Sequence, residues 1–78
     1  MMKVGSRVAR GRDWDASDDG DDGIPPGPGT VIAKYPDGWV DVRWHRRGNE
    51  QGNWMGGPQQ QYEVRLLPPL LVSAKKSI

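Results

Sequence analysis

Residues 30–44 constrain the fold more than any other part of this chain, because two alternating runs flank a strong turn signal. In the turn, Pro36-Asp37-Gly38, proline presets one backbone torsion and glycine accepts a positive φ. In the first run, residues 30–35, every second residue is Val, Ala or Tyr. In the second run, residues 39–44, we expect the core-facing residues to be Val40, Val42 and Trp44. The segment therefore predicts a β-hairpin.

Three further short runs predict the remaining strands. They are residues 3–10, with Val4 and Val8 on one face, residues 53–55, and residues 62–66, with Tyr62, Val64 and Leu66 on one face. No segment has the 3.6-residue periodicity of an amphipathic helix. The sequence predicts an all-β fold, a small SH3-like five-stranded barrel at residues 3–67 with a long acidic loop after strand 1. Residues 68–78 are predicted to form a Pro/Leu strap across the barrel and a flexible basic tail.

The long loop, residues 11–28, holds six aspartates between Asp13 and Asp22 and ends in a proline-rich stretch. The run of charge favours a solvated acidic loop beside basic strand faces, and the alternative is a loop that screens a basic binding surface. Residues 15–20 loosely match the start of an EF-hand, but position twelve of that loop is Pro26 instead of a bidentate glutamate. We expect no metal or other cofactor.

Composition excludes several kinds of chemistry. The chain has no cysteine, which removes disulfides, thiolate zinc sites and thiol nucleophiles, and His45 is the only histidine. No serine shows the partners that nucleophilic catalysis needs, so we expect a module that is not an enzyme. A net charge of +1 gives no reason to expect nucleic acid or an anionic membrane as the partner. Without an apolar segment of membrane-spanning length or a signal core, the expected location is cytoplasmic, with nuclear as a second possibility.

Four ordered motifs resemble the MIB/HERC domain, a module of Mind bomb and of several HECT-type ubiquitin ligases. They are Gly-x-Arg-Val-x-Arg-Gly-x-Asp-Trp at residues 5–14, Gly-x-Val at 29–31, Gly-Trp-Val-x-Val-x-Trp at 38–44, and the set Trp54, Gly57 and Tyr62-Glu63-Val64. The resemblance covers roughly residues 3–67. The chain departs from the family pattern in the loops and at one rim, at Ala16, His45, Met55 and Gln60, and it is about two residues longer between Trp44 and Trp54.

The resemblance implies recognition of a protein substrate or partner in association with ubiquitin ligases. Ligase chemistry would need a catalytic cysteine or a zinc-bound RING, and this chain has no cysteine. We therefore expect a monomeric protein-binding module whose partner is a cytoplasmic tail or disordered segment. The alternatives are a barrel that binds single-stranded nucleic acid through Arg43, Arg46, Arg47 and a tryptophan platform, and a docking subunit held through its Pro/Leu tail.

The predicted partner-binding residues are Arg7, Arg10, Trp14, Arg46, Trp54 and Met55. Trp14 and Trp54 adjoin loops, so surface recognition and core packing both remain open for them, whereas Trp44 and Tyr62 are expected in the core. On the rim interpretation, Trp54→Ala should leave the domain folded. Arg10 is expected to pair internally with Asp13 or a loop carbonyl, and the alternative is an arginine clamp on an acidic peptide.

Overall fold

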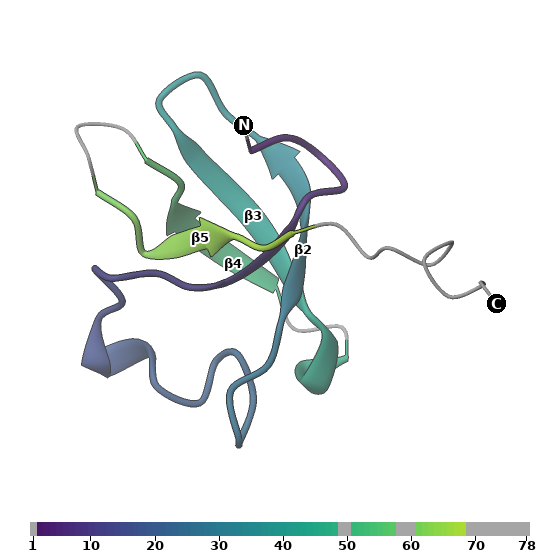
Figure 1. The fold of residues 1–78 in the computed structure, drawn as a ribbon, viewed down its shortest axis with the longest axis vertical. Helices are drawn as coiled ribbons and strands as arrows, with labels where there is room; N and C mark the ends of the chain where they lie inside the picture. Colours follow the sequence, from purple (N-terminus) through teal and green to yellow (C-terminus); the bar gives the residue numbers. More distant parts are fainter. Residues whose placement is uncertain (1, 49–50, 58–60, 69–78) are drawn as a thin grey trace, which may run out of the picture.

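In a computed structural model that describes residues 2–48, 51–57 and 61–68, the chain forms one five-stranded antiparallel sheet (Figure 1). The strands are β1 (Arg7–Arg10), β2 (Gly29–Lys34), β3 (Trp39–Trp44), β4 (Gln51–Met55) and β5 (Val64–Leu66). Their order across the sheet is β4-β3-β2-β1-β5. Two 3-10 turns complete the described elements, η1 (Ala16–Asp18) in the acidic loop and η2 (His45–Arg47) after β3. The all-β prediction is confirmed.

The β2–β3 hairpin forms where the alternating runs predict it. The Tyr35 amide donates to the Trp39 carbonyl at 3.0 Å, and Gly38 takes a φ of 93° in the turn. As predicted, Val40, Val42 and Trp44 are buried. Trp39, which alternates with them, is only half-buried, so the hairpin has a core face and an outer face.

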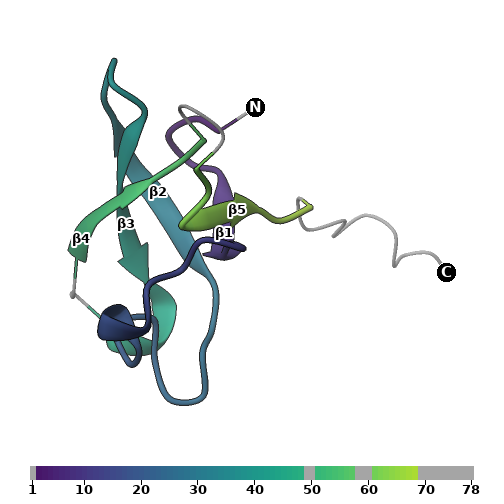
Figure 2. The ribbon, with the colours of Figure 1, turned by 90° about the vertical axis from the view of Figure 1, so that its left-hand side faces the viewer.

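The β1–β5 ladder lies across one face of the β2–β3–β4 meander, as Figures 1 and 2 show together. Val8 of β1 and Val64 of β5 meet the buried side chains of the meander in a single core. That core is small, as expected for this length, and its buried members are Met2, Val8, Val31, Val40, Val42, Trp44, Trp54 and Val64.

Among the residues that the structure describes, the sheet has two edges, β4 and β5, and no strand ladder closes it. A single bridge between Gly56 and Tyr62 joins the segments that flank these edges. Five antiparallel strands are therefore confirmed, whereas closure into a barrel stays a prediction.

Two aromatic placements differ from expectation. Trp54 is 5% exposed, so a rim position is wrong for it; it pairs with Val40 across β3 and β4 and shares the core face. Tyr62 is 38% exposed and lies outside the core, because its amide is bound by the Asp13 carboxylate and β5 begins only at Val64.

The first strand is shorter than predicted. It begins at Arg7, since the chain turns at Lys3, whose carbonyl accepts a hydrogen bond from the Ser6 amide. That turn leaves Val4 61% exposed and brings Met2 into the core instead. The predicted strap and tail fall almost entirely on residues 69–78, outside the described residues. Nowhere in the described ranges is there a helix of the length and apolarity that a membrane span requires.

Candidate binding groove

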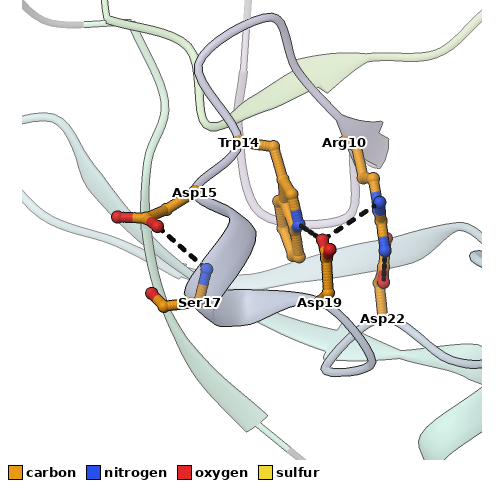
Figure 3. A network of polar contacts seen from close by, with 6 residues as sticks. All are labelled: Arg10, Trp14, Asp15, Ser17, Asp19 and Asp22. Carbon is orange, nitrogen blue, oxygen red and sulfur yellow. Dashed lines mark hydrogen bonds and ion pairs between the residues drawn. The ribbon is translucent and has the colours of Figure 1, made fainter.

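The acidic loop folds back onto Arg10 (Figure 3). The Arg10 guanidinium makes a two-point contact with Asp22, from Nε to Oδ2 at 2.7 Å and from Nη2 to Oδ1 at 3.0 Å. Its Nη1 lies 3.3 Å from Asp19 Oδ1. The Asp22 side chain is fully buried, and a buried carboxylate is stable mainly when paired in this way. The hydrogen bonds that Arg10 donates to Asp22 and the negative charges of Asp22 and Asp19 raise the pKa of Arg10.

Trp14 connects this ion-pair network to the core. Its indole N–H donates to Asp19 at 3.0 Å, and the Arg10 guanidinium carbon lies 5.0 Å from its ring centroid. The same ring stacks on Trp54 and meets Trp44 edge-on. Trp14 is half-buried, so packing and polar contacts both fix the start of the loop.

Asp13 ties the loop to the entrance of β5. Its carboxylate accepts a hydrogen bond from the Tyr62 amide at 2.7 Å, while its own amide donates to the Tyr62 carbonyl at 2.9 Å. The bond from Tyr62, with a smaller contribution from Arg12, lowers the pKa of Asp13. At Gly11 a β-carbon would collide with the Tyr62 carbonyl oxygen, so this close approach requires glycine.

Beside the loop lies a groove of about 450 Å³, which we call the arginine groove. One wall comes from β1 and β5, where Ala9 pairs with Arg65. The other comes from the proline-rich end of the acidic loop. The described residues that line the arginine groove are Arg7, Ala9, Arg10, Asp22, Pro26, Gly27, Pro28, Arg65 and Leu67.

The arginine groove carries positive charge on an otherwise apolar lining. Arg7 donates to the Pro68 carbonyl at 3.3 Å, and Arg65 donates to the Arg10 carbonyl at 3.1 Å. Within the described part of the chain, neither arginine forms an ion pair. Among the described residues of the lining, Asp22 is the only one with a carboxylate, and Arg10 already neutralises it. The groove can therefore accept carboxylates beside apolar side chains.

The structure brings some of the predicted binding residues together. Arg7 and Arg10 line the groove, and Arg10 pairs internally as expected, though with Asp22 and Asp19 instead of Asp13 or a carbonyl. Arg46 packs against Gly23 and Gly27 on the loop and is not part of the lining.

The other predicted residues lie elsewhere. Trp54 is in the core, and Met55 pairs with Trp39 at the far end of β3. Sequence reasoning missed Arg65, although the alternation in residues 62–66 places it opposite Val64 and therefore on the outer face.

A second hollow of about 540 Å³ lies between the N-terminal turn, the hairpin and β5. Its lining includes Met2, Val40, Tyr62 and Leu66, and none of the predicted binding residues. It is larger and more apolar than the arginine groove, and its charged lining residues, Lys34, Asp37 and Arg65, are of mixed sign.

Four carboxylates of the acidic loop, those of Asp13, Asp15, Asp19 and Asp22, contact protein groups. Asp19 and Asp22 face Arg10, and Asp15 caps η1 by accepting from the Ser17 amide at 2.9 Å, a bond that lowers the pKa of Asp15. Across residues 2–48, 51–57 and 61–68, no three His, Cys, Asp or Glu side chains cluster as metal ligands. His45 is exposed and contacts the Thr30 hydroxyl at 2.7 Å.

Comparison with known proteins shows similarity to E3 ubiquitin-protein ligases. The chain is 40% identical over 78 residues to the E3 ubiquitin-protein ligase HERC2 of Mus musculus. This alignment covers 99% of the chain and 2% of the mouse protein. The chain is 40% identical over 67 residues to the HERC2 of Homo sapiens, covering 85% of the chain and 1% of that protein. No family model matches the chain. The similarity agrees with a HERC-type region, and the MIB/HERC assignment stays a prediction.

Proposed function

We propose that this chain is a non-catalytic protein-interaction module associated with ubiquitin ligases, and that the arginine groove binds an extended acidic segment of the partner. The observation that carries the proposal is the pair Arg7 and Arg65. Both line the groove together with Pro26, Pro28 and Leu67, and neither forms an ion pair among the described residues. Arginine is well suited to carboxylates because its planar fork can donate two parallel hydrogen bonds.

The comparisons support the association with ligases. Both relatives are E3 ubiquitin-protein ligases by name, but the chain spans about 2% of the mouse protein. Ligase activity is accordingly not part of the proposal. We propose recognition of a cytoplasmic tail or disordered segment, by a monomer in the cytoplasm or nucleus.

We also propose that the fold is an SH3-like barrel of the MIB/HERC kind. The β1–β5 ladder across the meander and the Gly56–Tyr62 bridge between the flanks of the edge strands support this interpretation.

Titration of the labelled domain with three probes, followed by backbone amide NMR, tests the function. The probes are an extended Asp/Glu-Leu peptide, its Lys-Leu counterpart and a single-stranded oligonucleotide. We expect the acidic peptide to shift the backbone amide signals of β1, β5 and Gly27. Arg7→Ala/Arg65→Ala should weaken this binding about tenfold or more, because each arginine loses a charge-assisted bond.

The charge-matched control is Lys3→Ala/Lys34→Ala, which removes two exposed cations outside the groove. An equal loss in this control would indicate non-specific attraction and overturn the proposal. Binding of the oligonucleotide alone, with an affinity that falls steeply with salt, would favour the nucleic-acid alternative instead.

A further inference from the structure

The outer face of the β2–β3 hairpin presents two aromatic rings to solvent. Tyr35 and Trp39 oppose each other across the hairpin, through the hydrogen bond from the Tyr35 amide to the Trp39 carbonyl. Tyr35 is 42% exposed, and Trp39 is half-buried on the face opposite Val40 and Val42. Neither ring belongs to the cluster formed by Trp14, Trp44 and Trp54. Tryptophan and tyrosine are enriched among the residues that contribute most to binding at protein interfaces.

Carboxylates lie at the same end of the hairpin. Asp41, two residues after Trp39 on the same face of β3, accepts from the Tyr35 hydroxyl at 2.8 Å and from the Asn53 amide. Asp37, in the turn, accepts from the Trp39 backbone amide at 3.1 Å. In the part of the chain that the structure describes, neither carboxylate pairs with a cation.

A cleft of about 410 Å³ is lined by Tyr35, Pro36, Asp37, Trp39 and Asn53. Asp41 does not line it, but accepts hydrogen bonds from the side chains of two lining residues, Tyr35 and Asn53. The hydrogen bond that Tyr35 donates to Asp41 and the negative charge of Asp41 raise the pKa of Tyr35, so at neutral pH the phenol remains a donor. Aromatic faces and carboxylates both attract cations, whereas they disfavour anions.

We propose that this hairpin cleft binds a cationic side chain, a lysine or an arginine, of a protein partner. The ring faces of Trp39 and Tyr35 hold the alkyl stem and the charge, and Asp37 and Asp41 supply the negative field. The cleft differs from the arginine groove in position and in sign of charge, so it selects a different segment of the partner. This inference rests on the proposed protein-interaction role.

The test uses the four indole N–H signals of the domain in NMR. The probes are Gly-Lys-Gly and Gly-Arg-Gly peptides, and a Gly-norleucine-Gly peptide of similar length without the charge. We expect the cationic peptides to shift the Trp39 indole and the Tyr35 ring, with little effect from the norleucine peptide. Asp41→Asn should weaken binding about two- to fivefold, as for other exposed charge contacts, and Trp39→Ala should do the same.

Two controls make the outcome decisive. The indole signals of the other three tryptophans report whether Asp41→Asn is folded. The variant Arg7→Ala/Arg65→Ala should bind the cationic peptides as tightly as the parent, so the proposals for the arginine groove and for the hairpin cleft are tested independently. An unmoved Trp39 signal, or equal shifts with the norleucine peptide, would overturn the cleft proposal and leave the arginine groove unaffected.

Discussion

Replacing Trp54 with alanine should destabilise the fold strongly, because this ring sits between the two other clustered tryptophans. It stacks on Trp14 with ring centroids 6.1 Å apart and planes 9° apart. It meets Trp44 edge-on at 5.3 Å and 82°. Only 5% of Trp54 is exposed, so truncation would leave a cavity that water cannot fill favourably.

The expected cost is a large share of the total stability. Truncating a buried aromatic side chain to alanine costs about 3–5 kcal/mol. We expect Trp54→Ala to fall in the upper half of this range, because two aromatic pairs are lost together. A domain of 78 residues has a free energy of unfolding of about 4–12 kcal/mol at typical values per residue. The variant should therefore lose between about a third and all of this free energy of unfolding.

Guanidinium denaturation followed by far-UV circular dichroism measures this loss without relying on tryptophan fluorescence, which the substitution itself alters. The matched control is Trp39→Ala, the same change on the outer face of β3, with an expected cost below about 1 kcal/mol. A Trp54→Ala variant as stable as the parent, or equal losses for both variants, would refute the core position of Trp54.

Three further predictions concern the acidic loop and its anchors. In the folded state the hydrogen bond from the Tyr62 amide favours the ionised form of Asp13. The stability that this bond gives the fold is therefore complete above the ordinary Asp pKa of 3.8, and it is lost as the pH falls through the lowered pKa of Asp13. Asp13→Asn should flatten acid unfolding in that window when followed by circular dichroism, and an unchanged profile would contradict this assignment. Gly11→Ala, which forces a β-carbon into the Tyr62 carbonyl, should lower Tm by at least about 4 °C in a thermal melt; an equal Tm would show that the approach relaxes cheaply. Arg10→Lys cannot reproduce the two-point contact with Asp22, so loop amides should exchange with solvent faster in hydrogen-exchange measurements. Exchange at the parental rate would show that the loop does not depend on this pair.

The hairpin could be predicted from the sequence because its signals are local. The bounds of β3 and the burial of Val40, Val42 and Trp44 follow from alternation beside a turn that only a few residue types can form. The face of the sheet on which the Trp54 side chain lies could not be predicted. In a run of only three residues, 53–55, alternation does not show which residues face the core. That is set by the pairing of Trp54 with Val40 on another strand.

The partner of Arg10 was likewise beyond local reasoning. Asp22 is 12 residues away, inside a loop with six aspartates and no periodicity to distinguish them. Only the folded path of the loop selects Asp22 for burial. The arginine groove needed the same long-range information, because its walls come from β1, β5 and the end of this loop.

The ladder between β1 and β5 has a consequence for biosynthesis. Arg10 and Arg65, which share a hydrogen bond in this ladder, are 55 residues apart in the chain. At about 5–20 residues per second, a ribosome needs roughly 3–11 s to extend the chain from one to the other. Throughout that interval β1 lacks one of its two neighbours, Val64 is missing from the core, and Asp13 lacks the Tyr62 amide. The nascent domain therefore stays incomplete until its last strand leaves the exit tunnel, and until then its exposed β1 edge is open to pairing with other chains or to chaperones.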